Sequence, residues 1–82
     1  MDRVTPVASL DITREVCPMT YVRTKLKLES IDAGQVLEVL LRGEEPLQNI
    51  PRSAMEEGHE VVSLEPTASG SWRLLIRKNM RG

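Results

Sequence analysis

Cysteine is almost absent from this sequence, because Cys17 is the only one. A single thiol cannot close a disulfide within the chain, and it cannot supply the several thiolates of a structural zinc site. Histidine is equally scarce, since His59 stands alone at the start of a predicted strand, and we assign it no catalytic role. We therefore expect no internal disulfide, no metal ion and no cofactor.

Aromatic residues and long apolar runs are scarce as well. The chain has one tryptophan, one tyrosine and no phenylalanine, so few side chains are available to stack on nucleic acid bases. The longest apolar run, residues 36–41, contains Glu38 and is far shorter than the roughly 20 residues of a membrane-spanning helix. Residues 1–11 carry acid and proline where a secretory signal has a basic start and an apolar run. We expect a cytoplasmic protein that contacts neither membrane nor nucleic acid directly.

Charge is unevenly distributed, although the net charge is only −1. Residues 14–27 hold four basic side chains and one acid, whereas residues 44–65 hold six acids and one arginine. Such segments are typical of solvated faces, and the basic one is also compatible with a surface that binds a protein partner.

The order of predicted elements indicates the fold. Eighty-two residues suffice for one small core, and we expect a single domain over residues 1–82 with its core at about 8–78. Apolar patterns predict the strands. A first helix is predicted from Pro18 onwards, because the residues that follow are rich in Lys, Leu and Glu and include no Gly before Ile31. The predicted α/β (α+β) fold is a βαβαββ two-layer sandwich, with a four-stranded mixed sheet and two helices on one face. The predicted strands are 8–12, 35–41 (central), 59–64 and 72–76, and the predicted helices are 18–31 and 51–57, with a turn at 43–46, a loose turn before Pro51, a stop at Gly58 and a turn at 69–71.

The first helix has apolar residues on two sides, and only one side can face the sheet. One set is Tyr21, Leu28 and Ile31, and the other is Met19, Val22 and Leu26. The second set either packs under the other helix or forms an exposed strip that docks a partner. We expect the core to include Leu28, Ile31, Leu37, Val39, Ile50, Leu74 and Ile76.

Pro18 suits the first position of a helix, because its missing N–H would have no partner there. Cys17 would then be the N-cap residue or its neighbour, where unpaired N–H groups and the helix dipole favour a thiolate. Arg14 is a nearby cation that could favour it further. The alternative for a lone cysteine is a small buried hydrophobic residue.

Several motifs, taken in order, resemble the TusA/SirA-like family of small sulfur carriers over about residues 9–78. The resemblance depends on their spacing along so short a chain. The motifs are Leu10–Asp11, Cys17–Pro18, Gly34, Leu37–Glu38–Val39, Glu45–Pro46, Ile50–Pro51, Gly58–His59 and Ile76–Arg77–Lys78.

The resemblance implies a βαβαββ sandwich in which Cys17 is a sulfurtransferase-type carrier acting within a relay. It implies that Cys17 accepts sulfane sulfur as a persulfide from a cysteine desulfurase or a rhodanese and passes it to an acceptor protein. Destinations in the family include tRNA thiolation, molybdenum cofactor maturation and sulfur oxidation. A non-catalytic interaction or regulatory module that uses the basic first helix is the alternative.

Two positions depart from the family pattern. Thr20 replaces the second proline of Cys-Pro-x-Pro, and Arg14 replaces the usual glycine three residues before the cysteine. Arg14 could pair with a persulfide anion and Thr20 could bond backbone in the first helical turn, or both could be solvated and neutral in effect. We expect the partner to contact Met19, Thr20, Val22, Arg23 and Leu26.

Overall fold

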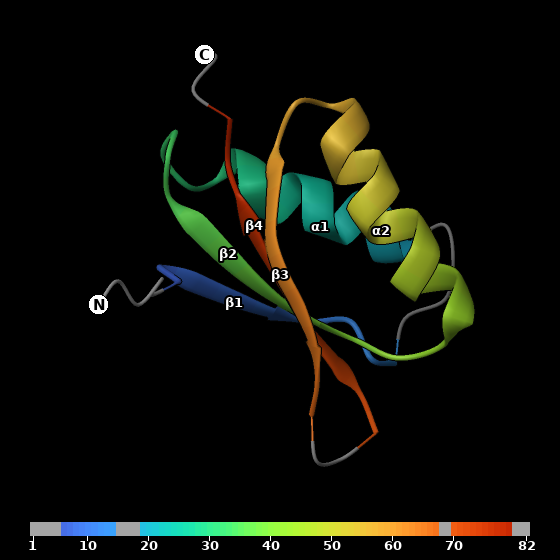
Figure 1. The fold of residues 1–82 in the computed structure, drawn as a ribbon. Coiled ribbons are helices and arrows are strands. Elements are labelled where there is room, and N and C mark those ends of the chain that lie inside the picture. Colours follow the sequence, from blue (N-terminus) through green and yellow to red (C-terminus); the bar gives the residue numbers. More distant parts are fainter. Residues whose placement is uncertain (1–5, 15–18, 68–69, 80–82) are drawn as a thin grey trace.

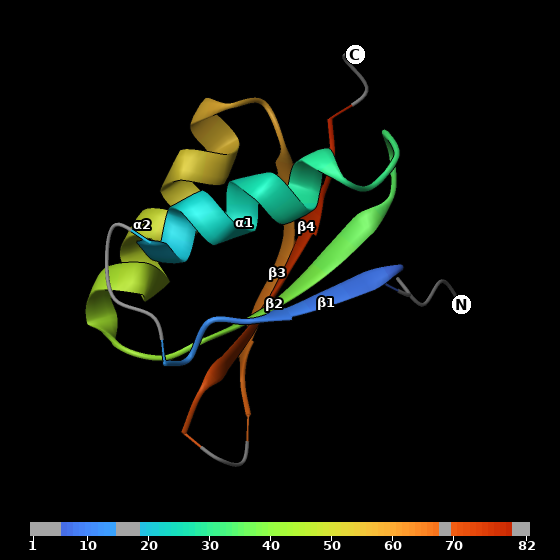
Figure 2. The same cartoon turned by 180° about the vertical axis from the view of Figure 1, so that it is seen from behind.

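The architecture is a two-layer sandwich of one sheet and two helices (Figure 1). The computed structural model describes residues 6–14, 19–67 and 70–79. Both helices cover the same face of the sheet, as the view from behind also shows (Figure 2). The predicted βαβαββ order and fold class are confirmed. The elements are β1 (Ala8–Asp11), α1 (Met19–Glu29), β2 (Val36–Leu41), α2 (Glu44–Glu56), β3 (Glu60–Pro66) and β4 (Trp72–Arg77).

The sheet is mixed and has the strand order β1-β2-β4-β3. β1 pairs parallel to β2, with Leu10 opposite Val39, and both other pairs are antiparallel. β2 is therefore central, as its sequence predicts, because it is apolar at every position except Glu38. β1 and β3 form the two edges of the sheet.

The core lies between the sheet and the two helices. All seven residues predicted for it are buried, and Leu37, Val39 and Ile76 have no exposed surface. Alternation along β2 explains the pattern, because every second side chain of a strand faces the helical layer. Ile12, Leu41 and Ala54 also belong to the core cluster.

Helix α1 packs one apolar side onto the core and exposes the other. Leu28 is 1% exposed, whereas Val22 is 42% and Leu26 is 62% exposed. Between these sides, Tyr21 points towards α2, where its hydroxyl donates to the Ser53 carbonyl at 3.4 Å. Burial raises the pKa of Tyr21, so the phenol stays protonated and able to donate. The strip of Val22 and Leu26 is thus exposed, and the side chain of Met19 lies outside the described residues.

The predictions of a turn at residues 43–46 and of a loose turn before Pro51 are wrong. Helix α2 runs without a break from Glu44 to Glu56. Gly43 is its N-cap residue with φ 101°. Pro46 falls in the first turn, where N–H groups have no intrahelical acceptor. Pro51 stands inside the helix at a cost of about 3 kcal/mol or more. Burial of one apolar stripe offsets this cost, since Ile50 and Ala54 are fully buried.

Gly58 ends α2, as predicted. With φ 91°, it allows the His59 amide to donate to the Ala54 carbonyl and its own amide to donate to Met55, each at 3.0 Å. This pair of bonds is the Schellman motif, in which a glycine adopts the left-handed conformation.

The other face of the sheet carries charged residues that pair with one another. Arg73 lies 3.5 Å from Glu38 on β2 and 3.5 Å from Glu65 on β3, and Arg77 lies 3.1 Å from Glu60. Cross-strand pairs of opposite charge stabilise a solvated sheet face.

Candidate functional site

The predicted persulfide site, Cys17 with Pro18, lies outside the described residues. The segments on either side of it are described: β1 ends at Asp11 and α1 begins at Met19. The first turn of α1 contains no acidic residue. An anion placed at this helix start would therefore meet the helix dipole without an opposing carboxylate in that turn.

A turn at the end of β1 anchors the segment that leads to Cys17. The Ile12 amide donates to the Leu40 carbonyl at 2.9 Å, and the Ile12 side chain is buried. Asp11 Oδ1 accepts from the Thr13 amide at 2.9 Å and from the Thr13 hydroxyl at 2.7 Å. These two bonds, the backbone one foremost, lower the pKa of Asp11, and the positive charge of Arg14 acts in the same direction. The turn fixes the chain direction up to Arg14.

Arg14 follows this turn, and its side chain is exposed. Its predicted contact with Cys17 lies outside the described residues. Met19 and Thr20, the next two predicted site residues, belong to α1, but their side chains are not among those that the structure describes. The remaining three predicted residues, Val22, Arg23 and Leu26, are exposed on α1.

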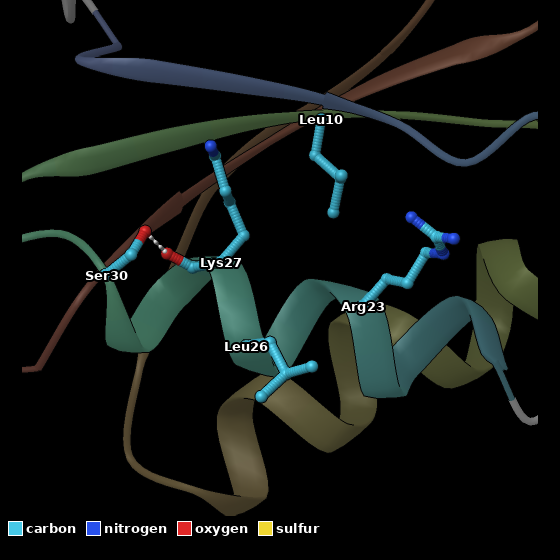
Figure 3. Close-up of a pocket in the computed structure, with 5 residues that line it drawn as sticks. All are labelled: Leu10, Arg23, Leu26, Lys27 and Ser30. Carbon is cyan, nitrogen blue, oxygen red and sulfur yellow. Dashed lines mark hydrogen bonds between the residues drawn. The ribbon is translucent and has the colours of Figure 1, made fainter.

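An open groove of about 290 Å³ runs between α1 and the edge strand β1. Arg23 and Lys27 extend from α1 towards β1, and the Leu10 side chain lies between them (Figure 3). At the end of α1, the Ser30 hydroxyl donates to the Lys27 carbonyl at 2.6 Å. We call this feature the β1–α1 groove; its lining residues are Leu10, Arg23, Leu26, Lys27 and Ser30.

The structure brings two of the predicted partner residues, Arg23 and Leu26, into this groove and leaves Val22 outside it. Leu10, Lys27 and Ser30 were not predicted. The spacing of residues 23, 26, 27 and 30 is the one that places side chains on a single side of a helix. That signal was available in the sequence, but the approach of Leu10 from another element was not.

Other sites for chemistry are few in the described part of the chain. It holds no group of three or more His, Cys, Asp or Glu side chains able to bind a metal ion. His59 Nδ1 accepts the Asn79 amide at 3.1 Å, so this ring nitrogen has a structural partner. Within residues 6–14, 19–67 and 70–79, no helix is long and apolar enough to cross a membrane.

Comparisons with known proteins agree on one family. The profile of the family described as Sulfurtransferase TusA matches residues 8–78. A protein of Archaeoglobus fulgidus, named as a sulfur carrier, is 46% identical over 69 residues, which are 84% of this chain and 78% of that protein. YedF of Escherichia coli, also named as a sulfur carrier, is 30% identical over 95% of this chain and 100% of its own length. The crystal structure of a SirA-like protein from Desulfitobacterium hafniense shares the fold, with a TM-score of 0.79 and 24% identity over 89% of this chain and 99% of that one.

Proposed function

Because this chain belongs to the TusA family and is a sulfur carrier of that type, we propose that Cys17 carries the sulfur as a persulfide. The observation that supports this most directly is that the span matching the family, residues 8–78, contains one thiol. Sulfane sulfur needs a thiol as its acceptor, and no other side chain in the sequence can provide it.

The proposed transfer is a thiolate exchange. The Cys17 thiolate attacks the outer sulfur of a donor persulfide, a new S–S bond forms on Cys17, and the donor leaves as a thiolate. The exchange needs no external oxidant, because the sulfane sulfur moves between two thiols. Pro18 sets the start of the helix, and the N–H groups of that helix stabilise the anion.

The donor in this proposal is a cysteine desulfurase or a rhodanese, and the acceptor is a further protein of a sulfur relay. The relay operates in the cytoplasm and supplies tRNA thiolation, cofactor maturation or sulfur metabolism. The partner contacts Met19, Thr20, Val22, Arg23 and Leu26. The exposure of Val22 and Leu26 on one side of α1 supports this choice, because exposed apolar residues that lie together can mark a surface that binds a partner.

A second candidate function uses the same helix without chemistry at the thiol. An interaction or regulatory module would bind through the exposed strip and the basic side chains of α1. The exposure of Leu26, at 62%, favours docking in either case. The two candidates differ in whether Cys17 takes up sulfur.

Intact-protein mass spectrometry distinguishes them. Incubated with a cysteine desulfurase and cysteine, or with a rhodanese and thiosulfate, the protein should gain one sulfur atom that dithiothreitol removes. Cys17→Ser should fold normally and gain none, because an alcohol cannot carry sulfane sulfur. If no donor loads the wild type while both proteins still bind a partner, the interaction module becomes the better description.

Arg14 is proposed as a positioning residue that favours the anionic sulfur. Arg14→Glu should slow sulfur uptake and move the pH midpoint of Cys17 alkylation by iodoacetamide to higher pH, and Arg14→Gln should do both to a smaller extent. Circular dichroism would check that the three proteins fold alike. Superimposable alkylation profiles would remove Arg14 from the mechanism.

A further inference from the structure

Lys78 joins the end of the last strand to the end of helix α1. Its ammonium Nζ donates to the Ile31 carbonyl at 2.7 Å and lies 3.5 Å from the Glu29 carbonyl. The end of α1 and the end of β4 therefore lie side by side (Figure 2). The last carbonyls of a helix lack intrahelical donors and form the negative end of the helix dipole, so a cation binds them favourably.

The main chain of Lys78 binds the same region. Its amide donates to the Gln35 carbonyl at 2.8 Å, and its carbonyl accepts from the Gly34 amide at 3.0 Å. The side chain and the main chain of one residue thus bind both ends of the connection from α1 to β2, residues 30–35. The C-terminal end of α1 is tied through Lys78 to the end of β4.

We propose that Lys78 is a positioning residue for partner recognition, because its ammonium group sets the orientation of α1 and with it the exposed strip of Val22 and Leu26. The proposal rests on the sulfur relay proposed above, in which this strip contacts a partner. Lys78 binds the end of α1 that lies opposite Met19, where the helix begins after the thiol. It therefore acts through the helix and not on the sulfur.

Burial of apolar side chains alone leaves the orientation of α1 less well defined. Leu28 and Ile31 are buried against the sheet and hold the helix on it. The hydrophobic effect is not directional, and helices pack over a range of crossing angles. A short charge-assisted bond to a main-chain carbonyl permits a much narrower range of geometries. Lys78 thus adds a directional restraint to a contact that is otherwise mostly apolar.

The restraint acts at one end of a helix whose exposed strip lies further along it. From Glu29 back to Val22 the axial distance is roughly 10 Å, at about 1.5 Å per residue. A tilt of about 10° at the end near Lys78 would move Val22 by roughly 2 Å. A displacement of about 1 Å is already enough to reduce a reaction that depends on orientation. A small loss of restraint at Lys78 is therefore sufficient to affect docking.

The neighbouring residue holds the other helix in the same way. Asn79 Nδ2 donates to the Glu57 carbonyl at the end of α2 at 2.9 Å. The side chain of Glu57 in turn lies 3.7 Å from Lys25 of α1. Residues 78 and 79 thus bind the C-terminal ends of both helices, which places the whole helical layer relative to the sheet.

Matched variants separate the charge of Lys78 from the size of its side chain. Lys78→Met keeps an unbranched side chain and removes the donor, whereas Lys78→Arg keeps a cation with several donors. Arg52→Met removes a cation from an exposed position of α2 and is the control. Urea unfolding followed by circular dichroism sets the conditions in which all four proteins are folded. Should Lys78→Met not fold, Lys78→Gln, whose neutral amide can still donate, takes its place.

Residual dipolar couplings of the full ¹⁵N-labelled chain measure the orientation of α1 relative to the sheet. In the wild type and in Lys78→Arg, the couplings of residues 21–29 and those of β2 and β4 should fit one rigid structure. In Lys78→Met the couplings of the two strands should still fit it, and those of α1 should not. Couplings of α1 that are unchanged in Lys78→Met would overturn the proposal.

Sulfur uptake is measured with the donor that loads the wild type, either a cysteine desulfurase with cysteine or a rhodanese with thiosulfate. The KM for Lys78→Met should rise about tenfold with kcat within about twofold, because a misplaced surface weakens docking and leaves the docked complex able to react. Lys78→Arg should restore the KM to within about threefold, and Arg52→Met should stay within about twofold of the wild type. An unchanged KM for Lys78→Met, or an equal rise for Arg52→Met, would contradict the proposal.

Alkylation of Cys17 by iodoacetamide distinguishes positioning from an effect on the thiol. This small reagent needs no docking, so its rate and pH midpoint should be the same in all four proteins. A loss of alkylation in Lys78→Met that parallels its loss of sulfur uptake would overturn the positioning role.

The two proposals fail in different ways. If the wild type takes up sulfur and Lys78→Met does so with the same KM, the positioning proposal fails alone. If no donor loads the wild type, the persulfide proposal fails, and the dipolar couplings still decide whether Lys78 orients α1.

Discussion

The backbone amide of Asn79 donates a hydrogen bond of 3.1 Å to His59 Nδ1. This bond joins the residue that precedes β3 to the chain beyond β4, and it requires an unprotonated Nδ1. Burial and the positive charge of Lys78 lower the pKa of His59, and Glu57 opposes them. The neutral ring is thus the form that the folded protein favours.

The pH dependence of stability follows from the lowered pKa of His59. An unfolded histidine binds a proton below about pH 6.5, and the folded one resists it, so the contribution is complete above that pH and is lost as the pH falls. Urea unfolding at pH 7.5 and 5.5 should show a larger loss for the wild type than for His59→Asn, whose side-chain oxygen offers an acceptor that does not titrate. Equal losses in the two proteins would contradict this assignment.

The two sides of α1 provide a matched pair of substitutions. Leu28→Ala should lower the free energy of unfolding by about 2–5 kcal/mol, as truncation of buried leucines does. Leu26→Ala, two residues earlier and 62% exposed, should change it by less than about 0.5 kcal/mol. Urea unfolding followed by circular dichroism measures both, and similar values for the two would show that the burial of α1 is wrongly described.

Alanine substitutions at two glycines distinguish the cost of a left-handed backbone from the cost of a steric contact. Among the described residues, none has an atom within 4 Å of a Cβ added at Gly70, whose φ is 84°. At Gly58, with φ 91°, that atom would lie 3.1 Å from Asn79 Nδ2. Gly70→Ala should cost about 1–2 kcal/mol through its left-handed backbone alone. Gly58→Ala should cost more, because relief of the contact moves Asn79 away from the Glu57 carbonyl, to which it donates at 2.9 Å. A smaller cost at Gly58 than at Gly70, measured by urea unfolding, would refute this order.

Pro51 should be replaceable with a gain in stability. Pro51→Ala restores an N–H that can donate to the Leu47 carbonyl and removes the ring from the helix interior, so we expect a gain of about 1–3 kcal/mol. Pro46→Ala is the control, because a first-turn residue needs no such bond and should gain little. Thermal unfolding of the two variants compares them. A gain at Pro46 as large as that at Pro51 would show that the position in the helix is not the cause.

The elements of the fold were predictable where local patterns and burial agree. The mostly apolar sequence of β2 indicates its central place, and the glycine after α2 marks the end of the helix. The start of α2 was misjudged because Gly43 and Pro46 are local turn signals, whereas the helix is stabilised by distant core contacts of Ile50. The two apolar sides of α1 are similar in sequence, and packing against α2 and the sheet confirms the predicted burial of Leu28 rather than Leu26.

The candidate site was predictable only in part for a similar reason. Arg23 and Leu26 follow Cys17 closely and belong to one helix, so sequence alone suggests them. The groove also requires Leu10, which reaches them through the parallel pairing of β1 with β2 and the crossover of α1. Which residues of two elements lie side by side depends on how all the elements pack, and sequence patterns within one element do not show this.

Strand β4 follows both β2 and β3 in the sequence, yet it lies between them in the sheet. While the chain is still on the ribosome, β3 emerges without the neighbour that joins it to the sheet, and one edge of β2 is unpaired. Such edges are open to wrong pairing with other nascent chains. Cys17 is therefore synthesised well before the sheet can form, because the sheet is complete only when residues 72–77 have left the exit tunnel.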